Sequence, residues 1–260
     1  MGCGAFAVCT CFKVVPSSGD CVFLSLTQWK FGEVPSLRPE VVTFDCYGTL
    51  IDWEVGIRGA FRSLLERTGG ARSVDVGRLF EFYEEEEKRV EKEEYRSYRE
   101  VLAETSRRLA SKTGLEISER DAGFLAEDLP SWKPFEETNP ALRKLGANCK
   151  LGILSNVDED LLAGTLKHLS VPFDLIVTAQ QVHSYKPGKA HFERAKKIIG
   201  GESTWVHVAG SLYHDVEPAV RLGVTVVWVN RKGLALPENI PRGGVSSVRG
   251  LGELSRLFGF

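Results

Sequence analysis

The stretch VVTFDCYGTL occupies residues 41–50 and places one carboxylate directly after a short apolar run. Val41, Val42 and Phe44 are β-branched or aromatic, and this run predicts a strand that is buried on both faces. A glycine three residues after the carboxylate supplies the backbone freedom that a tight turn requires. Asp45 is therefore predicted at the carboxyl end of a strand, which is the edge where open parallel sheets bind their ligands.

On this stretch alone, Asp45 has two interpretations. A carboxylate works as a nucleophile when the site holds a substrate in line with it and stabilises the leaving group, and the product is a covalent ester or acyl phosphate. An Asp that is followed within a few residues by Gly also commonly begins a turn without any catalytic role. The choice depends on the partners that the rest of the chain offers.

Length and charge favour a small-molecule substrate. The chain has 260 residues, enough for one large domain with a smaller one inserted, and its 33 basic and 35 acidic residues give a net charge of -2. This balance gives no reason to expect nucleic acid or an anionic membrane as a partner. No run approaches the roughly 18 apolar residues of a membrane-spanning helix. We expect a soluble cytoplasmic protein, with a homodimer as one option for its assembly.

The cysteines do not indicate a metal site. Six are present, and four of them fall within residues 1–21, where the paired CxxC spacing of zinc sites is missing. Residues 1–37 also lack convincing periodicity and do not read as a signal peptide. We expect this N-terminal extension to lie outside the fold, either as a disordered segment or as an error in the assignment of the start codon.

Residues 54–133 are predicted to form a helical cap domain. Apolar side chains recur at helical spacing, for example at Ile57, Phe61 and Leu64, and no second strong strand is evident. Residues 84–94 mix acidic and basic side chains three and four positions apart, which is typical of a solvated helix face. We therefore predict no acidic catalytic cluster there. A segment this long is an inserted domain rather than a connection.

The remaining parts, residues 38–53 and 134–260, are predicted to form an α/β core domain. After residue 134 strands and helices alternate, and such βα units specify a doubly wound parallel sheet covered on both faces. The predicted strands are residues 150–154, 175–177, 205–208 and 225–229, the last of the chain. The predicted helices are residues 141–145, which Gly146 should end, and residues 158–169, 191–199 and 216–222.

Polar residues that follow these strands should converge with Asp45. Ser155 and Asn156 come directly after a strand, where a hydroxyl and the N–H groups of a helix start can hold an oxyanion or a carboxylate. Lys186 can neutralise the nucleophile, and Asp215 can orient that lysine or a water molecule. Taken singly, Ser155 and Asp215 could each be an ordinary helix cap, and Lys186 could be a surface lysine. Together, their order and spacing indicate a catalytic site.

With these residues in place, the chain resembles the haloacid dehalogenase superfamily, and within it the 2-haloacid dehalogenase branch. Four motifs carry the resemblance, and they are FDCYGTL (44–50), ILSN (153–156), SYKP (184–187) and HVAGSLYHD (207–215). The resemblance covers the chain from about residue 38 onward. It implies a doubly wound core domain, with a helical cap over the active site.

The resemblance also implies roles for single residues. Asp45 would be the nucleophile, Lys186 its charge partner and Asp215 the acid near the hydrolytic water. The substrate-binding residues would be Tyr47, Thr49, Ser155, Asn156 and Ser211. Phosphatases of the superfamily carry Asp-x-Asp in the first motif, with the second Asp as general acid and with Mg²⁺ on the phosphate. Tyr47 stands in that second place, and since a phenol is a poor proton donor at neutral pH while halide leaves without a proton, it favours dehalogenation.

Several positions depart from the pattern of the branch. Gly210 and Leu212 stand where it usually carries Ser and Asn, and Phe192 stands where it carries Tyr. The halide-receiving Arg of the cap would be expected near residues 83–87, which are mostly acidic. Arg89, Arg96 or Arg99 could replace it only with a shifted helix register.

Three hypotheses follow. The first is hydrolytic dehalogenation of a small 2-haloacid through an aspartyl ester, without a cofactor. The second is an Mg²⁺-dependent phosphatase acting on a small phosphate ester, in which Asp45 and Asp215 would be the metal ligands. The third is a non-catalytic binding protein on the same fold. Retention of Asp45, Lys186 and Asp215 speaks against the third, because such groups are costly to hold together without use.

Overall fold

The structure is a computed structural model that describes residues 38–69, 74–201 and 203–260. The N-terminal extension, predicted to lie outside the fold, falls outside the described residues. Within them, a six-stranded parallel sheet has the order β3-β2-β1-β4-β5-β6, which confirms the predicted doubly wound α/β class. The strands are β1 (Val41–Phe44), β2 (Lys150–Ser155), β3 (Leu175–Thr178), β4 (Trp205–Ala209), β5 (Thr225–Val229) and β6 (Val245–Val248).

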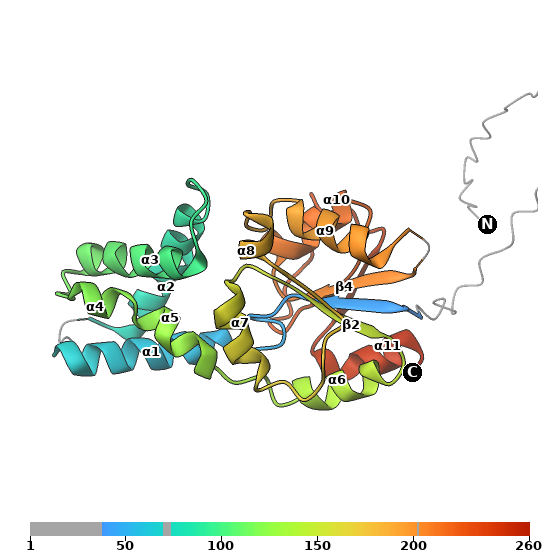
Figure 1. Ribbon diagram of the computed structural model, residues 1–260, viewed down its shortest axis with the longest axis horizontal. Coiled ribbons are helices and arrows are strands. Elements are labelled where there is room, and N and C mark those ends of the chain that lie inside the picture. Colours follow the sequence, from blue (N-terminus) through green and yellow to red (C-terminus); the bar gives the residue numbers. More distant parts are fainter. Residues whose placement is uncertain (1–37, 70–73, 202) are drawn as a thin grey trace, which may run out of the picture. The chain divides into compact units, whose positions relative to one another are not determined.

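Helices cover both faces of this sheet. Helices α9 and α10 lie on one face, and α6 and α11 lie on the other (Figure 1). Their bounds, with those of the shorter elements, are α6 (Thr138–Gly146), α7 (Glu159–Leu166), α8 (Ala179–Val182), α9 (Ala190–Ile199), the π-helical turn η3 (Leu212–Val216), α10 (Glu217–Arg221), η4 (Leu251–Glu253) and α11 (Leu254–Phe258).

The strands alternate their side chains between two apolar layers. Phe44 and Ile153 point into one layer, and Leu154 and Val177 point into the other, so every strand near the middle of the sheet is buried on both faces. This burial explains why the first strand can be identified from an uninterrupted apolar run. β1 lies between β2 and β4, which places Asp45 at the centre of the sheet edge.

Three sequence predictions for this region are wrong in detail. The strand at 225–229 is not the last, because β6 follows it. β6 lies at the sheet edge, and since only one of its four residues is buried, its sequence gives no clear signal for a strand. The helix predicted at 216–222 begins earlier, with the π-helical turn η3, whose wider turn departs from the 3.6-residue period of an α-helix. Gly146 does not stop α6, which starts at Thr138 and includes that glycine.

The segment between the first two strands is helical, as predicted. Its elements are α1 (Trp53–Thr68), α2 (Val76–Val90), α3 (Tyr98–Thr113), α4 (Glu119–Ala122), α5 (Phe124–Asp128) and η2 (Leu129–Ser131). The sequence sets the ends of these helices: Asp52 caps α1, Ser97 forms a capping box at α3, and Gly69 and Gly114 end α1 and α3 in the left-handed conformation. The boundaries of the cap as a separate domain stay a prediction.

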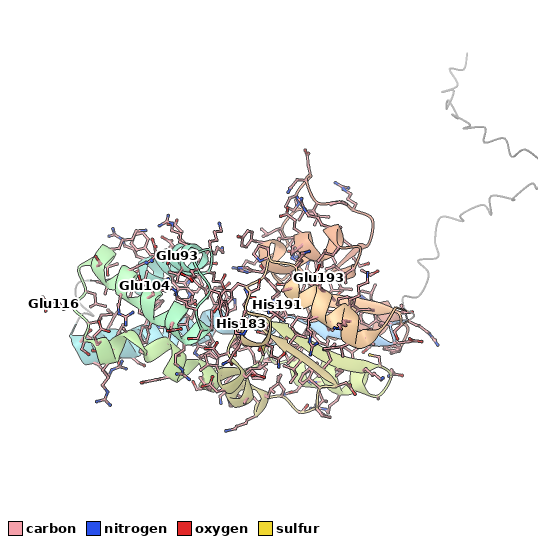
Figure 2. All side chains as sticks on the ribbon, turned by 45° about the horizontal axis from the view of Figure 1, so that its top comes forward. Glu93, Glu104, Glu116, His183, His191 and Glu193 are labelled. Atoms are coloured by element: carbon pink, nitrogen blue, oxygen red, sulfur yellow. The ribbon has the colours of Figure 1, made fainter. Side chains whose placement is uncertain are left out.

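The helices between β1 and α6 carry ion pairs on their surface and hydrogen bonds to the loop before α7. Arg108 pairs with both Glu93 and Glu104, two of the carboxylates that Figure 2 labels. The side chain of Asp158, just before α7, accepts hydrogen bonds from the backbone N–H groups of Tyr98 and Arg99 at 2.9 Å each, and so caps α3 from the core. Among the described residues, no helix combines the length and apolar character needed to cross a membrane.

Candidate active site

The loop after β1 holds Asp45 in a fixed orientation. The carbonyl of Cys46 accepts hydrogen bonds from three N–H groups of the loop, and Gly48 adopts a φ of 90°, which only glycine takes without strain. Thr49 Oγ1 donates to Asp45 Oδ2 at 2.9 Å and accepts the N–H of Gly210 at 2.9 Å. Thr49 therefore links the loop of Asp45 to the loop after β4.

Lys186 connects the two carboxylates that the sequence pattern indicates. Its Nζ lies 2.9 Å from Asp45 Oδ1 and 2.6 Å from Asp215 Oδ1, and it also donates to the carbonyl of Leu154 at 2.8 Å. These three acceptors engage all three N–H bonds of the ammonium group. The site thus brings together one cation and two anions in a buried place.

Burial and neighbouring charges shift the protonation equilibria of these groups. Burial raises the pKa of Asp45 above its usual range, with Lys186 opposing and the charge of Asp215 adding to this effect. For Asp215, burial acts upward, but Lys186 and a hydrogen bond from His207 outweigh it and leave the pKa below that of an ordinary carboxyl. Burial acts downward on the pKa of Lys186, and the two carboxylates raise it overall, so the lysine stays an ammonium.

Ser155, Asn156 and Ser211 take different positions. Ser155 Oγ is buried and has no hydrogen-bond partner among the described residues, so it is free to bind a ligand. Asn156 accepts the N–H of Lys186 at 2.7 Å and donates to its carbonyl at 3.0 Å, which holds the lysine's backbone in place. Ser211 caps η3 by accepting the N–H of His214. Whether these side chains bind substrate stays a prediction.

Tyr47 does not point toward the nucleophile's partners. Its hydroxyl lies 2.9 Å from Thr165 Oγ1 on α7, and its ring packs edge-on against Trp132. Burial raises the pKa of this phenol well above its ordinary value. At the position of the second Asp of the phosphatases, the site therefore holds a neutral hydroxyl with a partner of its own.

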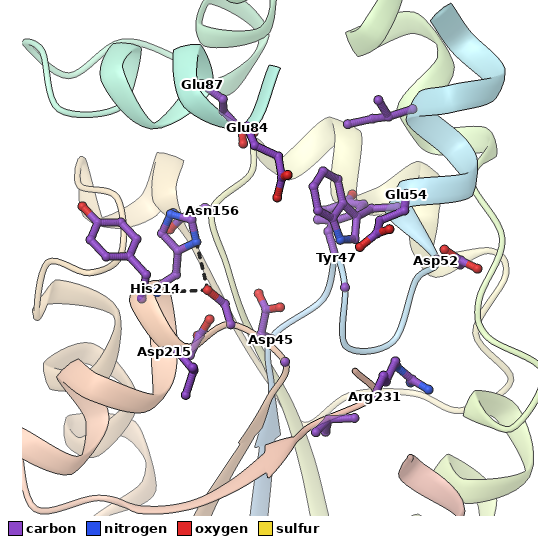
Figure 3. Close-up of a pocket in the computed structure, with 18 of the residues that line it drawn as sticks. Asp45, Tyr47, Asp52, Glu54, Glu84, Glu87, Asn156, His214, Asp215 and Arg231 are labelled. Atoms are coloured by element: carbon purple, nitrogen blue, oxygen red, sulfur yellow. Dashed lines mark hydrogen bonds between the residues drawn. The ribbon is translucent and has the colours of Figure 1, made fainter. Parts of the chain in front are cut away.

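A cavity of about 750 Å³ lies above these residues. Asp45, Ser155, Lys186 and Asp215 line its floor, and aromatic side chains such as Trp53 form part of its wall. On the cap side, Glu84 and Glu87 face Asp45 across this space (Figure 3).

The prediction that residues 84–94 form a purely solvated face is wrong. Glu84, Glu87, Lys88 and Glu91 all line the cavity. Their spacing of three, four and seven residues places them on one face of α2, and the same spacing in the sequence also suits a face turned to solvent. The burial of Tyr83 and Val90 beside them decides which way the helix turns this face.

Two of these carboxylates have unusual surroundings. Glu87 accepts hydrogen bonds from the hydroxyls of Tyr83 and Tyr98, and burial, with the nearby charge of Glu91, raises its pKa to about 7. Glu91 accepts a hydrogen bond from the amide of Asn156 at 3.2 Å and lies 3.3 Å from His214 Nε2. The residue that follows α2 thus contacts the loops after β2 and β4.

The three arginines considered as halide receivers lie elsewhere. Arg89 pairs with Glu86, Arg96 with Glu93 and Arg99 with Asp160, and none of the three lines the cavity. The cationic side chains that do line it, besides Lys186, are Arg58, Lys88, Arg231 and Lys232.

The sheet edge offers few side chains that could hold a metal ion. The described part of the chain contains no group of three or more His, Cys, Asp or Glu side chains placed to hold a metal ion. Gly210 stands where a metal-binding Asp would be required, and a Cβ there would lie 2.8 Å from the carbonyl oxygen of Gly48. An acidic side chain at this position would require the backbone to move.

Comparison with known proteins agrees with this geometry. A family model described as haloacid dehalogenase-like hydrolase matches residues 42–229. Among curated proteins, the chain is similar to haloacetate dehalogenase H-2 of Moraxella sp. (strain B), with 26% identity over 204 residues that cover 76% of this chain and 89% of the relative.

Solved structures show the same fold at lower identity. The defluorinating L-2-haloacid dehalogenase Rha0230 superimposes with a TM-score of 0.73 at 20% identity, over 87% of this chain and 98% of its own. The L-2-haloacid dehalogenase of Xanthobacter autotrophicus with chloropropionic acid covalently bound gives 0.70 at 21% identity, over 85% of this chain and 98% of its own.

Proposed function

Because the chain belongs to the haloacid dehalogenase-like hydrolase family, we propose that it hydrolyses a small 2-haloacid through an ester on Asp45, without a metal ion. The observation that carries this choice of leaving group is the position of Tyr47. Its hydroxyl is hydrogen-bonded to Thr165, so the place of the phosphatases' general acid holds a phenol, which is a poor proton donor to an alcohol. Halide leaves as an anion and needs no proton.

In the first step, a carboxylate oxygen of Asp45 attacks C2 of the substrate, and halide departs with the electron pair of its bond to carbon. Lys186 and Thr49 each hold one oxygen of Asp45 at 2.9 Å, which fixes the direction of attack. The unpartnered hydroxyl of Ser155 is placed on the cavity floor, where it would donate to the carboxylate of the substrate.

In the second step, water attacks the carbonyl carbon of the ester, and Asp215 accepts a proton from it. Collapse of the tetrahedral intermediate returns the Asp45 carboxylate and releases the 2-hydroxy acid, whose oxygen takes up the proton. The sum of the two steps converts the haloacid and water into the hydroxy acid, halide and one proton.

The departing halide requires a cationic or N–H rich cradle. Of the cations that line the cavity, Arg231 is bound to Glu137 and Lys232 to Glu54. Arg58 and Lys88 make no ion pair with another described residue, and we assign the halide to one of them.

The test is a turnover assay of the full chain against 2-chloropropionate and small phosphate esters, each with Mg²⁺ and with EDTA. We expect halide release that EDTA does not alter and that Asp45→Asn abolishes. With Asp215→Asn, we expect about one equivalent of halide per enzyme and an ester that mass spectrometry detects on Asp45. Phosphate release that EDTA abolishes, without halide release, would instead support the phosphatase hypothesis. No turnover of any substrate would support the hypothesis of a non-catalytic binding protein.

A further inference from the structure

A chain of hydrogen bonds runs behind Asp215, away from the cavity. Thr43 on β1 and His207 on β4 are register partners, so their side chains emerge next to each other on the same face of the sheet. The indole Nε1 of Trp205 donates to Thr43 Oγ1 at 2.8 Å, and Thr43 Oγ1 lies 2.9 Å from His207 Nδ1. His207 Nε2 then lies 3.0 Å from Asp215 Oδ1.

The groups at the two ends set the direction of these hydrogen bonds. An indole N–H can only donate and an ionised carboxylate can only accept, so the proton of the last bond must lie on His207 Nε2. In the neutral imidazole with its proton on Nε2, Nδ1 is an acceptor, and the hydroxyl of Thr43, which accepts from Trp205, donates to it. Every bond of the chain therefore points from Trp205 toward Asp215.

The two oxygens of Asp215 are consequently not equivalent. Oδ1 accepts from both His207 Nε2 and Lys186 Nζ, whereas Oδ2 is buried and has no partner among the described residues. Two donors on one oxygen fix the rotation of the carboxylate about its Cβ–Cγ bond. Asp215 also lines the cavity above Asp45, and of its two oxygens Oδ2 is the one without a donor among the described residues.

We propose that His207 is a positioning residue, which holds Oδ1 of Asp215 so that Oδ2 is the atom that accepts the proton of the hydrolytic water. This role rests on the proposed function, because it concerns the second step of that reaction. His207 touches neither the substrate nor Asp45, and it acts through Asp215.

The packing around His207 suits this role. The imidazole is completely buried, and Phe192 packs edge-on against it with ring centroids 5.3 Å apart and planes at 89°. Phe192 is the position where the dehalogenase branch carries a tyrosine. Because the imidazole is held by this ring and by a hydrogen bond on each nitrogen, it has one orientation and cannot exchange partners with solvent.

The reaction step is the one in which water adds to the ester. A new bond forms between the water oxygen and Cγ of Asp45, and one O–H bond of the water breaks as its proton passes to Asp215 Oδ2. The bond between the ester oxygen and Cγ then breaks, and the leaving oxygen receives that proton. His207 keeps its own Nε2 proton throughout.

The experiment compares His207→Phe with His207→Gln in the full chain, because the amide nitrogen of Gln can take the place of Nε2 and Phe cannot. Rapid-quench kinetics with 2-chloropropionate separate halide release in the first turnover from steady-state turnover, and mass spectrometry measures the ester on Asp45. For His207→Phe, we expect first-turnover halide release within about threefold of wild type, steady-state turnover about 100-fold lower, and accumulation of the ester. His207→Gln should restore part of the lost turnover.

A second variant tests the same role even if His207→Phe does not fold. Thr43→Val keeps the shape of the side chain and leaves His207 in place, but it removes the donor to Nδ1, and we expect a smaller defect in the same step. Equal losses of first-turnover halide release and steady-state turnover, or no accumulation of the ester, would overturn the role of His207. Failure of Asp215→Asn to release any halide would instead overturn the proposed function itself.

Discussion

Gly210→Ala should lower both stability and turnover, because the added methyl group meets the nucleophile's loop. A Cβ at residue 210 would lie 2.8 Å from the carbonyl oxygen of Gly48 and 3.7 Å from Thr49 Oγ1. Ordinary C···O contacts begin near about 3.3 Å, so one of the two loops must shift by about 0.5 Å. The φ of Gly210 is not in the left-handed range, and alanine brings no backbone strain of its own.

The contacts of Gly210 link such a shift to Asp45. The carbonyl of Gly210 accepts the indole N–H of Trp228, and its N–H donates to Thr49 Oγ1 in the same loop as Gly48. A shift of either loop therefore disturbs the hydroxyl of Thr49, which also holds Asp45. Forced overpacking costs about 1–3 kcal/mol of folding free energy. A displacement of 1 Å can cost about 100-fold in rate, and half of that displacement corresponds to about tenfold.

Urea unfolding and halide release by the full chain measure the two effects. Gly59→Ala is the matched control, because a Cβ there would meet nothing within 4 Å and the residue lies inside α1. This control should gain about 0.5–1 kcal/mol in stability and keep its turnover. Wild-type stability together with wild-type turnover in Gly210→Ala would refute the argument that this contact excludes a side chain.

Three further outcomes are expected. Tyr47→Phe should keep turnover within about threefold, whereas loss of a general acid would lower it about 100-fold or more. The pKa of Glu87 is about 7 in the folded protein, above its value in the unfolded chain. The free energy of unfolding should therefore fall as pH rises from the unfolded pKa through the folded one. Glu87→Gln should then be more stable than wild type by about 1–3 kcal/mol at pH 8, and this gain should shrink at pH 5, as measured by urea unfolding. Asp158→Ala, which removes the cap of α3, should lose about 2–3 kcal/mol by the same assay. Asp160→Ala, which removes an exposed ion pair, should lose less than about 1 kcal/mol.

Local sequence patterns are sufficient to predict most of the sheet and the place of Asp45 at its edge. An apolar strand followed by Asp and a glycine turn is such a pattern, and so are the βα units that follow it. The carboxyl ends of parallel strands meet at one edge, so Asp45, Lys186 and Asp215 can be grouped from their order along the chain. The edge strand β6 cannot be found in this way, because its half-buried polar residues leave no apolar run to detect.

What each of these groups does depends on tertiary structure. Lys186 lies 141 residues from Asp45 in the sequence, and no local pattern tells which oxygens its ammonium will bind. Strand register, which depends on how the whole sheet packs, places Thr43 beside His207 and so leaves one oxygen of Asp215 free. The rotation of α2 likewise turns Glu84 and Glu87 toward the cavity, because the burial of its apolar stripe against other helices sets that rotation. Hydrogen-bond directions and helix rotation depend on small shifts among residues that are distant in the sequence. Local sequence patterns do not carry that information, and only the packing of the folded chain sets it.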